Sequence, residues 1–275
     1  MSPMQLLIIG RGWSGEYIAE LASQLKWTFA STTTNGRNGT IPFVFDPASS
    51  DLSPFKALPE AETIVITFPL VQASGTLAFL NGYAQTHPNT QSKTILLGST
   101  RPWTVPLESK KPWISVQDPI DPQADPARSS AEDALLQKGG SVLNLSGLWG
   151  GTRQPSNWIS RIASSQDALA SRTSVHLVHG IDVARAVIAL AKDFTPGQRW
   201  IITDERVYDW WDLIGAWGNE DQKKWVSNLM DLNSVNALPR SPLELGRCLS
   251  SREFWKRFGI SPLVCRVDQE PSAKI

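Results

Sequence analysis

An apolar run that breaks on three regularly spaced glycines constrains this chain more than any other sequence feature. The run ends at Ile9, glycines follow at Gly10, Gly12 and Gly15, and a helical pattern begins near Ser14. At this spacing the first glycine permits a tight turn, the second lets the backbone approach a phosphate, and the third lets helix and strand pack closely. The helix N-terminus adds free N–H groups and positive potential. The pattern therefore predicts a site for the pyrophosphate of a dinucleotide.

Short apolar runs alternate with longer helical patterns along the first half of the chain, which favours parallel strands joined by crossover helices. We expect strands at 5–9, 28–32, 63–67, 93–98 and 141–145, and helices at 14–24, 72–85 and 128–137. The predicted fold class is α/β, with a Rossmann-type doubly wound parallel sheet. Residues 1–150 would form the cofactor-binding core. Residues 151–275 would return strands to that core and add a small, mostly helical substrate lobe, the whole forming one structural unit.

Composition excludes several classes of partner. The 26 basic and 26 acidic residues cancel, so the chain carries no electrostatic footprint for nucleic acid or an anionic membrane. Two cysteines are too few for a secreted disulfide framework and the N-terminal segment lacks a signal-peptide pattern, so we expect a cytoplasmic protein. No run approaches the roughly 20 apolar residues of a membrane helix. Histidines, cysteines and acids show no zinc-ligand spacing, so no metal is expected.

The segment after the second predicted strand favours NADP over NAD. An NAD site carries an Asp or Glu roughly 20 residues after the glycines, to bind the ribose hydroxyls. This chain reads WTFASTTTNGRNG there and has no acid in that stretch. Its hydroxyls, together with the guanidinium groups of Arg11 and Arg37, suit a 2′-phosphate, although Arg37 could also be a solvated turn residue. The predicted cofactor-binding residues are Gly10, Arg11, Gly12, Trp13, Gly15, Thr32, Thr33, Arg37, Phe68 and Pro69.

Six segments in a fixed order resemble a known superfamily. They are IIGRGWSG, TILLGST, ARSSAEDALL, VLNLSGLWGGTR, VHGIDVARAV and LSSREFWKRFGI, and they span nearly the whole chain. Together they resemble the short-chain dehydrogenase/reductases, and most closely the atypical extended branch that is similar to NAD(P)-dependent epimerase/dehydratases. The resemblance implies a Rossmann sheet with a small C-terminal substrate lobe, a small-molecule substrate and the option of a homodimer.

The resemblance carries over only part of the family's catalytic machinery. That machinery is a Ser or Thr at the end of the LLGST strand and a Tyr-x-x-x-Lys pair on the next helix, where the tyrosine moves a proton and the lysine holds the nicotinamide ribose. Ser99 and Thr100 match the hydroxyl position. Pro126 stands where the tyrosine belongs, and Ser130 stands where the lysine belongs. The chain's tyrosines, at positions 17, 83 and 208, lie elsewhere.

A substitute acid or base could come from the C-terminal half of the chain, or from Asp118 after the LLGST strand. Our candidate catalytic residues are Ser99, Thr100, His176 and Tyr208. A histidine could donate a proton near neutral pH, but His179 fits better as part of a strand-to-helix turn. Asp182 fits better as a helix N-cap or as the ion-pair partner of Arg185.

The sequence thus predicts an NADP-dependent oxidoreductase that reduces a carbonyl or imine of a small organic substrate. The 12 tryptophans allow an aromatic-lined cleft, although core and surface packing explains tryptophans more often. Two other functions stay open. One is a redox-neutral isomerase, cyclase or lyase on the same fold, and the other is a non-catalytic regulator that senses NADP. These three functions are distinguished by whether the protein binds NADPH and whether it oxidises the bound NADPH when a substrate is present.

Overall fold

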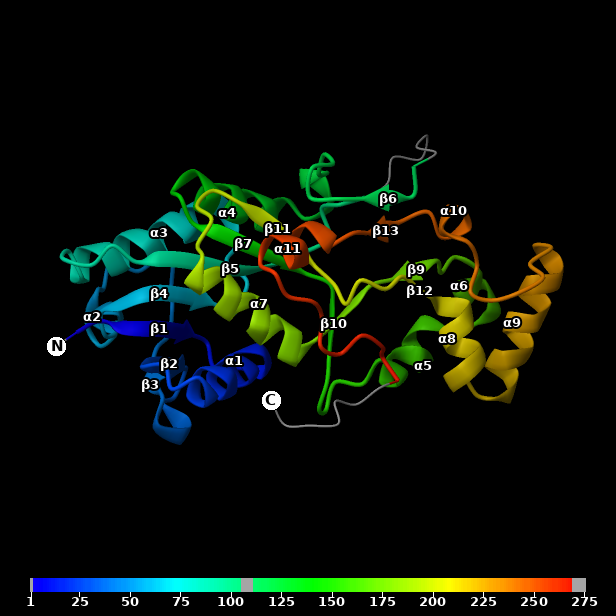
Figure 1. Ribbon diagram of the computed structural model, residues 1–275, viewed down its shortest axis with the longest axis horizontal. Helices are drawn as coiled ribbons and strands as arrows, with labels where there is room; N and C mark the ends of the chain where they lie inside the picture. The colour runs from blue at the N-terminus through cyan, green and yellow to red at the C-terminus, as the bar shows by residue number, and fades with distance from the viewer. Residues whose placement is uncertain (1, 105–110, 269–275) are drawn as a thin grey trace.

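A seven-stranded parallel sheet forms the centre of the molecule (Figure 1). The computed structural model describes residues 2–104 and 111–268. The spatial order of the strands is β11-β7-β5-β4-β1-β2-β3, which is a doubly wound order that reverses between β1 and β4. The strands are β1 (Met4–Ile9), β2 (Phe29–Thr33), β3 (Ile41–Pro42), β4 (Ala61–Ile66), β5 (Lys93–Ser99), β7 (Ser141–Leu145) and β11 (Arg199–Ile202). The predicted Rossmann-type fold class is confirmed.

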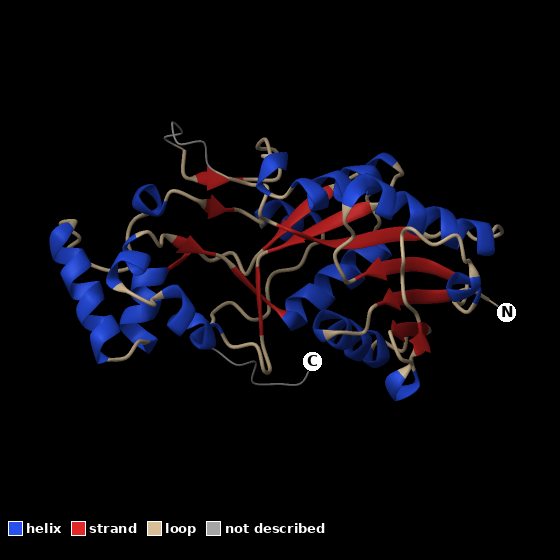
Figure 2. Cartoon of the chain, turned by 180° about the vertical axis from the view of Figure 1, so that it is seen from behind, coloured by secondary structure: helices blue, strands red, loops and turns tan. Residues whose placement is uncertain are grey.

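Helices cover both faces of this sheet, as the view from behind also shows (Figure 2). One face packs against α1 (Trp13–Gln24), α7 (Gly180–Lys192) and α11 (Arg252–Arg257). The other packs against α2 (Ser53–Lys56), α3 (Gln72–Thr86) and α4 (Pro126–Gln137). Because both faces are buried, the central strands consist almost entirely of apolar residues, which is why their sequence signal is continuous rather than alternating.

The predicted elements match these strands and helices to within a few residues. The strand expected at 28–32 is displaced by one position, to Phe29–Thr33. The helix expected from residue 128 begins earlier, at Pro126, because proline suits the first turn of a helix. The short elements after β2 are not predicted from the sequence: β3 and the 3-10 helix Arg37–Gly39 lack enough residues to show a period.

The second half of the chain adds a lobe at the end of the sheet farthest from the N-terminus (Figures 1 and 2). Its helices are α5 (Ile159–Ile162), α6 (Gln166–Ala170), α8 (Trp210–Trp217), α9 (Glu220–Leu232) and α10 (Pro242–Leu245), with a 3-10 turn at Pro155–Trp158. Another 3-10 turn, Pro122–Ala124, precedes α4. Two strand pairs join the lobe to the core: β8 (Gly147–Trp149) with β10 (Leu177–His179), and β6 (Trp113–Ile114) with β13 (Cys248–Leu249). A third pair, β9 (Ser174–Val175) with β12 (Tyr208–Asp209), lies within the second half of the chain.

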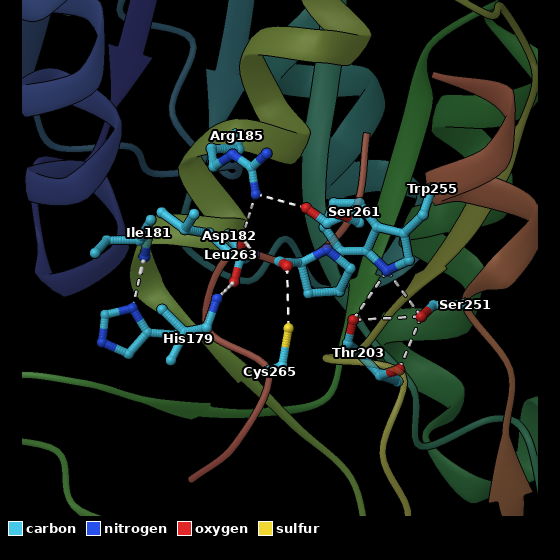
Figure 3. A network of polar contacts seen from close by, with 12 residues as sticks. His179, Ile181, Asp182, Arg185, Thr203, Ser251, Trp255, Ser261, Leu263 and Cys265 are labelled. Atoms are coloured by element: carbon cyan, nitrogen blue, oxygen red, sulfur yellow. Dashed lines mark hydrogen bonds and ion pairs between the residues drawn. The ribbon is translucent and has the colours of Figure 1, made fainter. Parts of the chain in front are cut away.

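A buried carboxylate ties the C-terminal segment to α7 (Figure 3). Asp182 is fully buried and accepts hydrogen bonds from the backbone N–H groups of Leu263 and Val264, at 2.7 and 2.9 Å. It also pairs with Arg185 at 2.7 Å, which is one of the two roles that the sequence allows. The N-cap role belongs instead to His179, whose Nδ1 accepts from the N–H of Ile181.

We predict that Asp182→Ala lowers the free energy of unfolding by about 3–5 kcal/mol, because it leaves a partly buried guanidinium and two backbone N–H groups without their acceptor. Urea unfolding followed by tryptophan fluorescence measures the change. The matched control is Asp193→Ala, which removes a carboxylate that pairs with Arg257 at the exposed end of the same helix. The control should unfold like the wild type, and an equal loss in both variants would contradict the anchoring role of Asp182.

Candidate functional site

A cavity of about 590 Å³ opens at the carboxyl ends of β1, β2 and β4, beside the point where the strand order reverses. This is the position where open α/β sheets bind their ligands. Every predicted cofactor-binding residue except Gly15 lines it. The lining is Gly10, Arg11, Gly12, Trp13, Ser14, Thr32, Thr33, Thr34, Arg37, Phe43, Val44, Phe45, Thr67, Phe68, Pro69, Leu148 and Arg153.

The three glycines of the loop have three different physical roles. Gly10 has a φ of +100°, and a Cβ there would lie 2.7 Å from the hydroxyl oxygen of Thr67. A Cβ on Gly15 would lie 2.6 Å from the carbonyl oxygen of Gly10, so this glycine permits the close approach of α1 to β1 from behind the cavity. A Cβ on Gly12 would meet nothing within 4 Å, so here the glycine leaves space for a ligand.

The helix end at this loop is available to an anion. Gly12 is the N-cap residue of α1, and no side chain caps the helix. Its first-turn N–H groups therefore keep their capacity to bind phosphate oxygens, and the helix dipole adds positive potential. Together, the open face of Gly12, the uncapped helix and the size of the cavity fit the pyrophosphate of a dinucleotide.

The charged residues that line the cavity all have the same sign. Arg11, Arg37 and Arg153 line it, and no Asp or Glu does so among the described residues. Arg11 also pairs with Glu16 at 3.0 Å, just outside the cavity. Arg153 lies over the ring of Trp13, with its guanidinium carbon 4.7 Å from the ring centroid. The cavity is therefore built for an anion.

Sequence reasoning missed one side of this cavity. Phe43, Val44 and Phe45 follow β3 and form an apolar wall beside Phe68. Arg153 comes from the loop after β8, which lies far along the chain. The segments FVF and GGTR each directly follow a strand, and this position is typical of a ligand-binding loop. The two strands are too short to be predicted from the sequence, so the position of these segments could not be recognised.

The two hydroxyl residues matched to the family's catalytic position lie at the carboxyl end of β5. Ser99 is the last residue of the strand, and its N–H donates to Oε1 of Glu132 on α4 at 3.2 Å. Thr100 follows and is 7% exposed, and its N–H donates to the carbonyl of Leu145 on β7 at 3.2 Å. These bonds hold the turn after β5 against the neighbouring strand.

A buried ionic network lies beneath this turn. Glu132 is 2% exposed and accepts from Asn144 and from Arg199, both at 2.7 Å. Burial raises the pKa of the Glu132 carboxyl above its usual value. A Cβ on Gly98 would lie only 2.7 Å from the amide nitrogen of Asn144, so this glycine makes room for the network.

The start of α4 is where the family pattern has its tyrosine and lysine. Pro126 begins the helix on its exposed side, and the hydroxyl of Ser130 donates back to the carbonyl of Ala127. Neither side chain carries the phenol or the ammonium group that the resemblance would place there.

The structure does not bring His176 or Tyr208 to the cavity lined by the glycine loop. His176 is 3% exposed, and its Nε2 accepts from the N–H of Leu249 at 2.9 Å. Burial lowers the pKa of His176 to about 3, so the ring is neutral near pH 7. Tyr208 donates to Asp204 at 2.6 Å and lines a separate lobe cavity of about 300 Å³. Asp118 accepts from the N–H of Ser115 in a surface turn.

No protein-family model matches the chain, and no curated protein sequence matches it. Solved structures with a similar fold do exist. A reductase engineered for asymmetric catalysis is 14% identical, with a TM-score of 0.65 over 95% of each chain. A protein from Methylobacillus flagellatus assigned as an NAD-dependent epimerase/dehydratase is 17% identical, with a TM-score of 0.62 over 93% of this chain and 92% of that one. RMD from Pseudomonas aeruginosa, complexed with NADPH, is 15% identical, with a TM-score of 0.59 over 94% of each chain.

The chain shares a Rossmann-type fold with these structures. The fold thus agrees with the resemblance found in the sequence segments. Within residues 2–104 and 111–268, no helix is both long and apolar enough to cross a membrane. In the same residues, no three His, Cys, Asp or Glu side chains gather in a way that could hold a metal ion.

The buried carboxyl group of Asp204 is expected to make the stability of the protein depend on pH. Burial raises its pKa from 3.8 to about 7, despite the hydrogen bond from Tyr208. Between these values the unfolded chain loses a proton that the folded chain keeps. The contribution of Asp204 to the free energy of unfolding should therefore fall as pH rises from about 4 to about 7, by at most ~1.4 kcal/mol per pH unit, and then level off. His176, whose pKa is lowered by burial, contributes a slope of the opposite sign below about pH 6.5, so the contribution of Asp204 is measured as a difference between variants.

Urea titrations at four pH values between 4 and 8 measure this slope. As pH rises over this range, the wild type should lose stability relative to Asp204→Asn, while Asp193→Asn should keep the wild-type profile, because the pKa of the Asp193 carboxyl is lowered. An unchanged slope in Asp204→Asn would show that other groups cause it.

Proposed function

We propose that this protein is an NADPH-dependent oxidoreductase that reduces a carbonyl or imine group of a small organic substrate. The observation that carries the proposal is the glycine-loop cavity, which three arginines line and to which no described carboxylate contributes. A carboxylate at the end of β2 would repel a 2′-phosphate, and Thr32 and Thr33 stand there instead. The fold supports the same class of chemistry, since a reductase and an NADPH complex are among the similar structures.

Each part of the cavity then has a task in holding the cofactor. The open face of Gly12 and the uncapped end of α1 would hold the pyrophosphate. Arg37, which is exposed, and Arg11 would bind the 2′-phosphate through charge-assisted hydrogen bonds. The bound cofactor would supply a hydride to the substrate.

Thr100 is the residue we assign to the substrate. Its hydroxyl would donate a hydrogen bond to the acceptor oxygen or nitrogen and so stabilise the charge that develops during hydride transfer. The backbone of Thr100 is held by Leu145 on one side and by Arg247 on the other, which fixes the position of the hydroxyl-bearing residue. Such preorganisation partly offsets the lack of the family's tyrosine and lysine.

The first test is a titration of the protein with NADPH and with NADH, followed by tryptophan fluorescence. We expect tight binding of NADPH and weak binding of NADH. Arg37→Gln should weaken NADPH binding about 10- to 100-fold, the effect of one charge-assisted hydrogen bond, and leave NADH binding unchanged. The exposed arginine of α5 supplies the control, Arg161→Gln, which should bind both cofactors like the wild type. Equal affinities of the wild type for NADPH and NADH would overturn the NADP preference.

The second test concerns turnover. A screen of aldehydes, ketones and imines with NADPH should yield substrates, and Thr100→Ala should lower kcat on them about 100-fold with unchanged NADPH affinity. Thr104→Ala, four residues on and exposed, is the matched control. Full activity of Thr100→Ala would remove this residue from the mechanism. NADPH binding without turnover of any compound would instead favour the regulator, and conversion without a nicotinamide absorbance change would favour a redox-neutral enzyme.

A further inference from the structure

Arg247 carries a charge that nothing in the proposed cofactor site uses. It lies between α10 and β13, and its side chain reaches across to the turn after β5. Its Nε donates to the carbonyl of Trp103 at 2.6 Å, and its Nη2 donates to the carbonyl of Thr100 at 2.7 Å. No carboxylate among the described residues pairs with it.

The guanidinium of Arg247 is half-buried and has no carboxylate partner among the described residues. Partial removal of this charge from water is costly, and an anion that binds its free donors would offset that cost. Burial lowers the pKa of Arg247, which shows the same desolvation. By contrast, the buried Arg240 of the lobe binds both oxygens of Asp209 at 2.6 and 2.9 Å.

The geometry of the guanidinium shows where an anion could bind. Nε–H and one N–H of Nη2 lie along one edge of the group, and the two backbone carbonyls occupy this edge. The second edge, formed by Nη1 and the other N–H of Nη2, has no partner among the described residues. A planar carboxylate or a phosphate matches such an edge with two parallel hydrogen bonds.

Two further buried donors occur on the segments around Arg247. Nδ1 of His176 has no hydrogen-bond partner, although the residue is only 3% exposed. Because Nε2 of this neutral ring accepts from the N–H of Leu249, Nδ1 carries the proton and is an unused donor. The hydroxyl of Ser146 is also buried without a partner, on the residue between Leu145, which accepts from Thr100, and Gly147, which donates to His176.

We infer that Arg247 binds an anionic group of the substrate, a carboxylate or a phosphate, beside Thr100, with His176 and Ser146 as neutral donors on the surrounding segments. The inference rests on the proposed function, because it places this subsite next to the residue that would contact the reacting carbonyl or imine. It narrows the substrates to small oxo or imino compounds that also carry an acid group. The site lies at the junction of core and lobe, where substrate pockets commonly form.

The test uses the full chain saturated with NADP⁺, so that the cofactor fills the cavity that Arg11, Arg37 and Arg153 line. Sodium benzoate, phenyl phosphate and neutral benzamide are titrated, with tryptophan fluorescence as the readout. We expect benzoate or phenyl phosphate to bind at least tenfold more tightly than benzamide, and the tighter of the two identifies the acid group. Arg247→Gln should abolish the preference, and Arg247→Lys should keep only part of it, because an ammonium lacks the planar edge.

A control variant shows whether the preference for anions depends on Arg247 itself. Arg252→Gln removes an exposed arginine of α11, so it should keep the wild-type preference for the anions. NADP⁺ affinity of each Arg247 variant is measured first, and a wild-type value shows that the variant is folded. If Arg247→Gln fails to fold, Arg247→Lys decides.

Failure of this inference and failure of the proposed function give different results in these titrations. Equal binding of benzoate, phenyl phosphate and benzamide by the wild type would overturn the inference, as would a preference that survives in Arg247→Gln. Absence of NADP⁺ binding by the wild type would overturn the proposed function instead. In that case the same titrations without cofactor, run in the Arg37→Gln background, still decide whether Arg247 binds an anion.

Discussion

The approach of α1 to β1 is the constraint on which the rest of the cofactor site depends. Gly15 lies so close to the carbonyl of Gly10 that any side chain there would overlap it. This contact directs the first turn of the helix toward the carboxyl edge of the sheet, where the order of strands reverses. The helix end, the open Gly12 and the arginines therefore meet at one place. Without this packing the same residues would be dispersed.

The turn after β5, where we propose that the substrate binds, depends on different interactions. Around Thr100 the structure relies on buried polar groups: the network of Glu132, Asn144 and Arg199 beneath the strand, and Arg247 from the lobe. Buried ionic groups of this kind add little net stability, but removing one partner is costly. They hold the turn after β5 in a defined conformation. The proposed reductase would need such rigid placement, because one hydroxyl would have to polarise the acceptor.

Buried hydrogen bonds of Asp182 and Trp255 hold the C-terminal part of the chain, and the sequence could predict only some of the contacts of Asp182. Asp182 holds the C-terminal segment through backbone N–H groups, and Trp255 donates to Thr203 and Ser251 behind it (Figure 3). Sequence reasoning paired Asp182 with Arg185 correctly, since three positions along a helix are neighbours. It had no means to find the contacts with Leu263 and Val264, because those residues are some 80 positions away.

The sequence by itself determined the parallel sheet, its flanking helices and the glycine loop, because local periodicity and glycine spacing are properties of neighbouring residues. All but one of the predicted cofactor-binding residues therefore line one cavity. Only the tertiary structure decided which distant groups complete that cavity, such as Phe43 and Arg153, and that His176 is a neutral, buried side chain outside it. It alone placed Arg247 beside Thr100, because contacts across 147 positions of chain depend on packing between elements that no local pattern encodes.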